Sequence, residues 1–290
     1  MRANMSLSFA KFKALTRFEQ SLFGLPFVLT AVLLPFGDPT FFATLTQKEW
    51  LRLLFVIPAF FSARISGMAF NQLIDRKIDA LNPRTCNRPL PSALVSPKQA
   101  ASVAVIALFS LFFFSFCIRY QCFLISLIAA FFLCIYSYMK RVHFSCHVVL
   151  GIIHFLSPVT AYLAIKGRVD LPAILLGCIA FFSIAASDII YAIQDYGFDQ
   201  KHNLHSIPSR FGLEKGLLVA KIFHAMCFPC LIFFGLSLPV SGVYFFIIPF
   251  IFLCFFYFYR NWRRDFRAFF FCSVGVSMSV FVFTAISLLI

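Results

Sequence analysis

The sequence predicts an all-α, polytopic membrane protein with about nine transmembrane helices around a central cavity. Hydrophobic residues make up 61% of the 290 residues and charged residues only 12%, whereas about a quarter of the residues in soluble domains are charged. Because so few charged side chains cannot cover a water-soluble globule, the lipid bilayer must surround this chain. The apolar residues form long runs without the alternating pattern of a barrel, so the spans are helices.

Each predicted span is an apolar stretch of about 20 residues. Arg17 and Glu19 directly precede the first stretch and no small-residue cleavage site follows it, so we expect this stretch to stay as a membrane span. The chain has no Pro/Gly/Ser-rich linker, so residues 1–290 are expected to form a single integral domain. In chain order, the nine stretches lie near residues 21–37, 51–71, 100–118, 120–138, 147–165, 171–193, 216–236, 240–259 and 268–289.

The distribution of basic residues tests this number of spans. The N-terminal segment and every second loop are basic, and these loops lie near residues 72–99, 139–146, 194–215 and 260–267. The alternate loops hold only Lys48, Arg52, Arg119, Lys166 and Arg168. Basic loops mark the cytoplasmic side, so we expect the N-terminus there and the C-terminus on the opposite side. The net charge of +14 is not gathered on one soluble face, so no nucleic-acid partner is predicted.

Two acidic motifs follow the second and the sixth predicted spans. In the first, Asn71, Asp75 and Asp79 recur every four residues, so on a helix they share one face. Arg64 lies on the same face, seven residues earlier and deeper in the apolar span. An arginine within a transmembrane segment usually faces a cavity and a partner, so this face is predicted to line a polar site.

The second motif extends from residue 188 to residue 199. Asp188, Tyr191, Asp195 and Asp199 have offsets of three, seven and eleven, which predicts one helix face again. Three carboxylates on one face repel each other unless cations hold them together. Asp188 lies at the membrane boundary, where an unpaired carboxylate is unfavourable.

The chemistry of the two motifs favours magnesium. Carboxylate and amide oxygens are hard donors that suit Mg²⁺, which commonly takes its other ligands from substrate phosphates. Arg and Lys residues near both motifs would stabilise a departing anion, and the apolar bundle below would house a long isoprenoid tail. The nearby basic residues are Arg76, Lys77, Arg84, Arg88, Lys140, Arg141, Lys201 and Arg210.

Each of these features also has an ordinary structural explanation. A single acidic motif is explained about equally well by a metal site and by a solvated helix face whose negative charge Arg76 and Lys77 balance. Two such motifs on one side of the membrane make the solvated face the weaker explanation. Lys140 and Arg141 can be topology signals, and residues 87–92 can be a turn that two prolines make rigid.

The ordered set of motifs resembles the UbiA superfamily of intramembrane aromatic prenyltransferases. Residues 71–79 match its signature N-x-x-x-D-x-x-x-D, residues 84–92 match R-T-x-x-R-P-L-P-S, and residues 188–199 match its second Asp-rich signature. Residues 138–141 resemble a further cytoplasmic element, and Gln72 and Gln194 are modest departures. The second motif is most similar to the branch that prenylates 4-hydroxybenzoate, although enzymes that act on a naphthoate-type acceptor in menaquinone biosynthesis share these motifs.

This resemblance implies Mg²⁺-dependent transfer of a polyprenyl group from a polyprenyl pyrophosphate to an aromatic acid in respiratory quinone biosynthesis, within a bacterial cytoplasmic membrane. The implied metal ligands are Asn71, Asp75, Asp79, Asp195 and Asp199. The residues implied to neutralise the departing pyrophosphate are Arg84, Arg88, Lys140 and Arg141. Asp188 or Asp195 would orient or deprotonate the acceptor phenol, with Tyr191 near the ring or the pyrophosphate. Arg64 would pair with the acceptor carboxylate through its two-pronged donor set, or instead contact pyrophosphate or an Asp.

Two functions of other classes compete with this one. Charged residues within the membrane and two motifs half a chain apart also suit a transporter, which would move its substrate and form no covalent product. A purely structural membrane subunit would leave the two aligned Asp faces unexplained.

Overall fold

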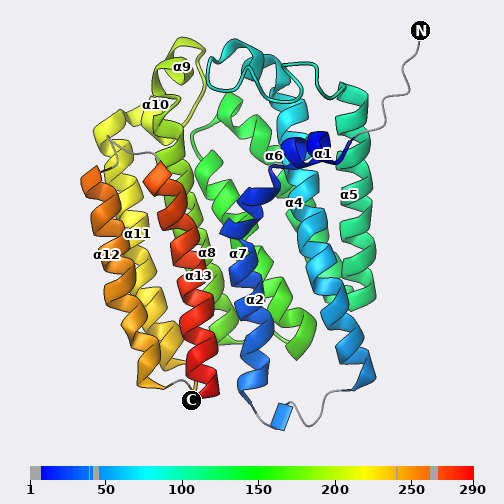
Figure 1. Cartoon of the computed structure of the whole chain (residues 1–290), viewed down its shortest axis with the longest axis vertical. Helices are drawn as coiled ribbons and strands as arrows, with labels where there is room; N and C mark the ends of the chain where they lie inside the picture. The colour runs from blue at the N-terminus through cyan, green and yellow to red at the C-terminus, as the bar shows by residue number, and fades with distance from the viewer. Residues whose placement is uncertain (1–7, 39, 42–45, 240, 262–266) are drawn as a thin grey trace.

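The computed structural model describes residues 8–38, 40–41, 46–239, 241–261 and 267–290, and every regular element in these ranges is a helix (Figure 1). Eight helical segments of the described residues are long and apolar enough to cross a membrane. The prediction of an all-α integral membrane protein is therefore confirmed. The helices that carry these segments are α4 (Gln47–Leu81), α5 (Pro97–Ile118), α6 (Tyr120–Val142), α7 (Cys146–Lys166), α8 (Leu171–Ile193), α11 (Leu213–Leu236), α12 (Ile247–Asn261, preceded by η3, Gly242–Phe246) and α13 (Arg267–Leu289).

The first predicted span, near 21–37, is shorter than expected. It contains a 3₁₀ helix, η1 (Phe18–Phe23), then α2 (Leu25–Leu33), and a second 3₁₀ turn, η2 (Leu34–Gly37). Pro26 stands at the start of α2, where its missing N–H is tolerated, and Pro35 lies within the tighter η2 turn. The apolar helical stretch Leu25–Gly37 is thus below the length of the other spans, and the described residues form eight long spans and this short helix in place of nine equal spans.

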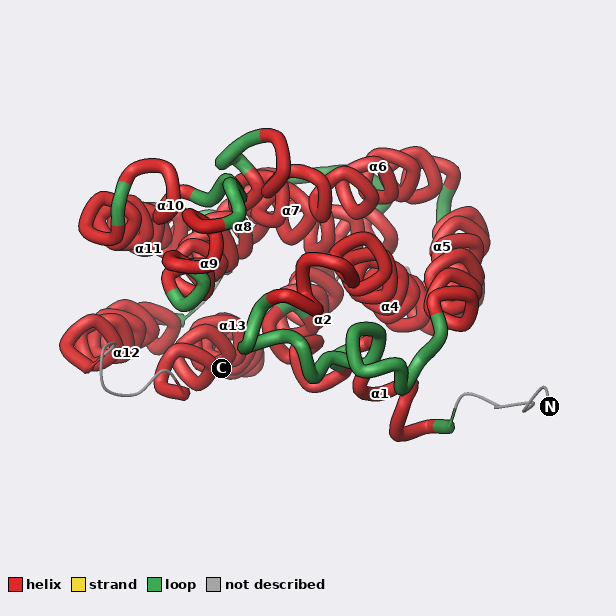
Figure 2. Tube along the Cα trace, turned by 90° about the horizontal axis from the view of Figure 1, so that it is seen from above, coloured by secondary structure: helices red, strands yellow, loops and turns green. Residues whose placement is uncertain are grey.

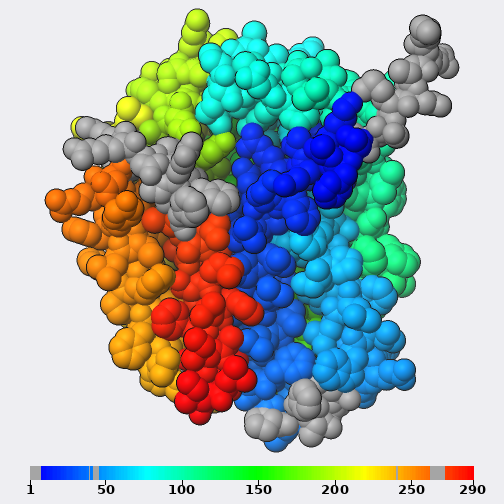
Figure 3. Space-filling view, viewed as in Figure 1, coloured from blue at the N-terminus to red at the C-terminus, as the bar shows by residue number. Residues whose placement is uncertain are grey.

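The helices pack largely in chain order into one bundle. Viewed down the bundle, α4 to α7 lie toward one side and α8, α11, α12 and α13 toward the other, with α2 between α4 and α13 (Figure 2). The blue α2 and the red α13 touch on the face seen in Figure 3. This contact brings the short helix α2 and the last described span together.

Glycines allow α7 and α8 to approach closely. A Cβ atom on Gly151 would lie 2.8 Å from the Phe181 ring, and one on Gly177 would lie 2.7 Å from the Phe155 ring. Small residues at membrane helix interfaces permit such close backbone packing. A larger side chain at either position would therefore disturb the α7–α8 contact.

One end of the bundle carries both acidic motifs, and we call it the motif end. It is covered by the loop at 82–96 and the short helices α9 (Tyr196–Lys201) and α10 (Ile207–Phe211), as Figures 1 and 3 show. The helix α4 has 35 residues, about 52 Å at ~1.5 Å per residue, so it extends well past the predicted span at 51–71. Its last turns carry the first motif to the motif end.

Candidate active site

A cavity of about 580 Å³ lies inside the bundle and reaches the motif end, where Asp79, Arg84 and Asp195 line it. All the predicted site residues line it, from both motifs, the loop at 82–96, α6 and the deep Arg64. Its far part is apolar and is lined by side chains such as Val28, Val56, Leu111, Ile118 and Ile125. The cavity therefore joins a highly charged mouth to an apolar depth.

The first motif keeps the predicted single face because α4 continues unbroken to Leu81. The Asn71 amide donates to Asp75 Oδ2 at 2.9 Å and to Ser137 Oγ at 3.2 Å. Asp79 is buried, with 6% of its surface exposed. These oxygens line the cavity as the four-residue spacing predicted.

The second motif does not lie on one continuous helix, contrary to the prediction. The helix α8 ends at Ile193, and Asp195 occupies the cap before α9 with φ −94° and ψ 4°. Asp188 and Tyr191 thus belong to α8, whereas Asp199 belongs to α9. The break nevertheless leaves all four side chains on the cavity wall.

Four cations predicted to bind pyrophosphate each pair with one carboxylate of the motifs. Arg84 binds both carboxylate oxygens of Asp195, with Nε to Oδ1 at 2.7 Å, and this fork geometry is a strong form of ion pair. The other three pairs are Arg88–Asp79 at 2.7 Å, Arg141–Asp75 at 3.0 Å and Lys140–Asp199 at 4.0 Å. The cations thus offset the repulsion expected between the carboxylates.

The loop at 82–96 is held in place by its own hydrogen bonds. The Arg84 backbone N–H donates to Asn82 Oδ1 at 2.9 Å, and Thr85 Oγ1 donates to the Asp79 carbonyl at 3.1 Å. Asn82 also donates to Asp195 Oδ1 at 3.0 Å. The predicted turn at residues 87–92 is present, with the Ser92 backbone N–H donating to the Arg88 carbonyl at 3.0 Å, and the loop also presents Arg84 to the second motif.

Tyr191 lies beside the same arginine. Arg84 Nη1 donates to Tyr191 Oη at 2.6 Å, and the guanidinium lies 4.7 Å from the centre of the tyrosine ring. Of the two positions expected for Tyr191, this contact favours the charged mouth.

The two carboxylates near α9 differ in their electrostatics. Burial alone would raise the pKa of Asp195, but the hydrogen bonds and charge of Arg84, aided by Asn82, hold it below the ordinary value. Burial raises the pKa of Asp199, and the nearby Asp195 adds to this rise against the opposing charge of Lys140. Asp195 is thus the more firmly ionised of the two.

A second polar cluster lies deeper in the cavity. His147 Nδ1 lies 2.7 Å from Asp188 Oδ2, and the Tyr136 hydroxyl is 3.5 Å from Asp188 Oδ1. Arg64 Nη2 donates to Gln20 Oε1 at 3.2 Å. Its Nε is buried without a hydrogen-bond partner among the described residues, so Arg64 has unused donor capacity.

Sequence reasoning missed several of these residues. His147, His154 and Tyr136 line the cavity or contact Asp188, yet they belong to none of the predicted motifs. The available signal was two histidines seven residues apart in an apolar span, since polar residues there usually face the bundle interior. Arg17 also lines the cavity, although its place before the first span predicted only a topological role.

The donor set fits magnesium only together with a phosphate ligand. Among the described residues, no group of three His, Cys, Asp or Glu side chains is close enough to hold a metal ion. Mg²⁺ needs only one or two carboxylates when substrate phosphates and water complete its octahedron. The carboxylates and the Asn71 amide on one cavity wall meet that requirement.

Comparison with known proteins relates this chain to a family. The sequence profile of the UbiA prenyltransferase family matches residues 25–282. The 4-hydroxybenzoate octaprenyltransferase of Aliivibrio fischeri (strain MJ11) is 29% identical over 197 residues, which cover 68% of this chain and 68% of that protein. The protein of the same name from Aliivibrio salmonicida is 29% identical over 241 residues, 83% of this chain and 82% of that protein.

Solved structures share the fold. A UbiA homolog from Aeropyrum pernix K1 gives a TM-score of 0.80 at 23% identity and covers 92% of this chain and 98% of its own. A UbiA homolog from Archaeoglobus fulgidus, bound to DMAPP and Mg²⁺, gives 0.71 at 21% identity and covers 95% and 99%. Because the family profile matches most of its residues, the chain belongs to the UbiA prenyltransferase family.

Proposed function

We propose that this prenyltransferase uses Mg²⁺ to transfer a polyprenyl group from a polyprenyl pyrophosphate to an aromatic acid of the 4-hydroxybenzoate type. The observation that carries the proposal is a single cavity with a charged mouth, an apolar depth and an arginine, Arg64, that no described carboxylate pairs with. The mouth suits pyrophosphate, the depth suits an isoprenoid tail, and Arg64 suits an acceptor carboxylate.

Pyrophosphate would bind by replacing the carboxylates as the partner of the four cations. Arg84, Arg88, Lys140 and Arg141 turn from their carboxylates to the phosphate oxygens, which frees the carboxylates for metal. Asn71, Asp75 and Asp79 on one side, and Asp195 and Asp199 on the other, would then hold Mg²⁺. The bound metal would draw charge from the breaking bond between carbon and oxygen. The homolog from A. fulgidus that was solved with DMAPP and Mg²⁺ supports this ligand pair.

The reaction then follows from the layout of the cavity. The allylic C–O bond breaks with both electrons leaving on pyrophosphate, where the arginines and Lys140 stabilise the charge. The apolar walls keep water from the allylic cation. The ring carbon ortho to the acceptor hydroxyl supplies the electron pair of the new C–C bond. Asp188, held by His147 at 2.7 Å, orients the phenol and accepts the proton released by the ring.

Arg64 and the relatives support an acceptor of the 4-hydroxybenzoate type. Two 4-hydroxybenzoate octaprenyltransferases are 29% identical to this chain, and a guanidinium in the cavity recognises an aryl carboxylate through paired hydrogen bonds. A hydroxynaphthoate offers the same carboxylate and phenol, so the experiment includes it.

We also propose that the motif end faces the cytoplasm of a bacterium, where Mg²⁺ and a water-soluble aromatic acid are available. The bias of basic residues toward this end supports that orientation. The predicted basic loop near 260–267 lies mostly outside the described residues.

Prenyl transfer by purified protein in liposomes tests the proposal. The protein is given polyprenyl pyrophosphate with 4-hydroxybenzoate and hydroxynaphthoate in parallel, and mass spectrometry identifies the products. We expect prenylated 4-hydroxybenzoate and released pyrophosphate, both lost with EDTA and restored by Mg²⁺. The variant Asp188→Asn should lower turnover by about 10²-fold or more. Full activity in EDTA would contradict the metal role, a naphthoate product would reassign the acceptor, and flux without product would favour a transporter.

A further inference from the structure

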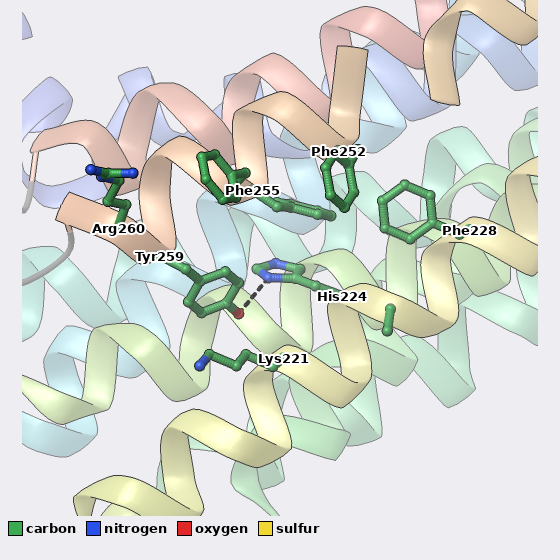
Figure 4. Close-up of a pocket in the computed structure, with 9 residues that line it drawn as sticks. Lys221, His224, Phe228, Phe252, Phe255, Tyr259 and Arg260 are labelled. Carbon is green, nitrogen blue, oxygen red and sulfur yellow. Dashed lines mark hydrogen bonds between the residues drawn. The ribbon is translucent and has the colours of Figure 1, made fainter. Parts of the chain in front are cut away.

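A second pocket lies on the side of the bundle between α11 and α12 (Figure 4). Its volume is about 480 Å³, and it shares no lining residue with the central cavity. Aromatic side chains form its walls, notably Phe228 on α11 and Phe252, Phe255 and Tyr259 on α12. We call it the lateral groove, and nothing in prenyl transfer uses it.

The polar groups in the wall of the lateral groove satisfy each other. His224 Nδ1 lies 2.8 Å from Tyr259 Oη, and the His224 ring stacks on Phe255 with 4.0 Å between centroids. The wall therefore presents an almost entirely apolar surface. A ligand that fills it must be apolar over most of its length.

Two exposed cations stand at one end of the lateral groove. Lys221 and Arg260 lie at the same end of the pocket in Figure 4, while Phe228 and Phe252 lie at the other. Lys221 is near the start of α11 and Arg260 near the end of α12, so both lie toward the motif end of the bundle. The groove thus has the polarity of a membrane lipid, charged near the surface and apolar at depth.

These cations have no acidic partner within the described ranges. The contact described for Lys221 is with the Tyr259 ring, 5.5 Å from Nζ to the centroid, and none of the described ion pairs includes Arg260. A lysine within a membrane span, without a carboxylate, is unfavourable unless it reaches water or meets an anion. An anionic ligand would supply the missing charge.

We infer that the lateral groove binds an anionic glycerophospholipid, with its phosphodiester between Lys221 and Arg260 and an acyl chain along the phenylalanines. No lining residue is a carboxylate. A pyrophosphate that carried bound Mg²⁺ would therefore find no carboxylate ligand for the metal in the groove. A phosphodiester carries a single negative charge that two cations are sufficient to neutralise. The lipid would join α11 to α12 and stabilise the C-terminal part of the bundle.

Lipid retention and thermal unfolding in detergent test this inference without measuring prenyl transfer. Purified protein is titrated with phosphatidylglycerol or with phosphatidylcholine of the same chains, and native mass spectrometry counts bound lipid. We expect phosphatidylglycerol to bind at one site and raise the melting temperature. The double variant Lys221→Gln/Arg260→Gln should bind it at least about tenfold more weakly. The control Lys215→Gln/Lys48→Gln removes two exposed charges outside the groove and should bind it normally.

A second pair of variants tests the apolar wall. Ala225 lines the lateral groove, whereas the neighbouring Met226 is exposed and does not. Ala225→Trp fills the groove with both cations intact and should abolish the preference for phosphatidylglycerol, while Met226→Trp should preserve it. Equal binding by the double variant and the wild type would overturn the inference. Displacement of phosphatidylglycerol by geranylgeranyl pyrophosphate, or by glycerol 3-phosphate alone, would overturn it too and reassign the site.

Discussion

Arg64 differs from the other predicted substrate-binding cations. Arg84, Arg88, Lys140 and Arg141 each pair with a carboxylate, whereas the hydrogen bond described for Arg64 is to the neutral Gln20 amide. A guanidinium whose buried Nε–H donor has no described partner gains most from a ligand that brings a negative charge. The positive charge of Arg64 therefore has no described carboxylate partner, and an anionic ligand at its depth in the cavity would neutralise it.

We expect Arg64→Ala to raise the KM for 4-hydroxybenzoate by about 10- to 100-fold, because a charge-assisted hydrogen bond contributes roughly 1.5–3 kcal/mol. The KM for the prenyl donor should change little. The methyl ester of 4-hydroxybenzoate is the matched control, since it lacks the carboxylate and should lose nothing further in the variant. Steady-state kinetics with both acceptors measures this, and an unchanged acceptor KM would contradict the role.

The Arg84–Asp195 pair makes a prediction about pH. Arg84 lowers the pKa of Asp195 in the native protein, so the pair stabilises the fold above the ordinary Asp pKa of about 3.9 and loses this contribution as the pH falls through the lowered native value. In Arg84→Met, burial acts on Asp195 without the arginine and raises its pKa. The sign then reverses, and the ionised carboxylate destabilises the variant as the pH rises.

Arg84→Met should therefore reduce the free energy of unfolding at pH 7 by up to about 3 kcal/mol, and the melting temperature should fall accordingly. This loss of stability should be smaller at pH 5. Adding Asp195→Asn should restore much of the loss at pH 7, because the uncompensated charge is gone. Thermal unfolding of the three proteins at both pH values checks this. A deficit that is the same at both pH values would indicate lost packing in place of lost charge.

At the scale of elements, the two motifs show how far sequence periodicity reaches. The four-residue spacing of Asn71, Asp75 and Asp79 predicted one face correctly because α4 runs unbroken to Leu81. The same logic was wrong for the second motif, where α8 ends at Ile193 and Asp195 caps α9. Carboxylates at these offsets are compatible with one continuous helix and also with two helices joined by a turn. The contacts of Asp195 with Asn82 and Arg84, which the sequence does not reveal, accompany the second arrangement.

The α7–α8 interface offers a test of packing. Gly177→Leu should destabilise the protein by about 1–3 kcal/mol, because the added side chain overlaps Phe155 and Val159 in a close-packed interface. Gly275→Leu on α13 is the matched control, since a Cβ atom added there would meet nothing within 4 Å, and leucine favours the helix more than glycine. Melting temperatures in detergent measure both, and equal losses would contradict the packing argument.

At the scale of the whole molecule, hydropathy and charge predicted the fold class and placed both motifs at one end. They did not predict which cation meets which carboxylate, because three of the four pairs join residues that are far apart in the sequence. The fourth pair, Arg88–Asp79, depends on how the loop at 82–96 folds back on α4. The short first helix was also missed, because an apolar stretch such as residues 21–37 does not reveal the 3₁₀ segments η1 and η2 that flank α2.

The bundle also predicts where the C-terminus lies. The helix α13 ends at the end of the molecule opposite the motif end (Figure 1). If the motif end is cytoplasmic, alkaline phosphatase fused after Ile290 should be active and green fluorescent protein at the same position should be dark. The reverse pattern would invert the proposed orientation and leave the site geometry unchanged.

The length of α4 has a consequence for how two unlike reactants meet. Of its 35 residues, about 20 suffice to cross the hydrocarbon, so the turns that carry Asp75 and Asp79 stand toward the water. The prenyl donor can then keep its isoprenoid tail in the lipid while its pyrophosphate remains near water. The ionised aromatic acid can enter from the water without crossing the membrane. On the proposed function, the protein is a phase-transfer catalyst fixed at a boundary between two solvents.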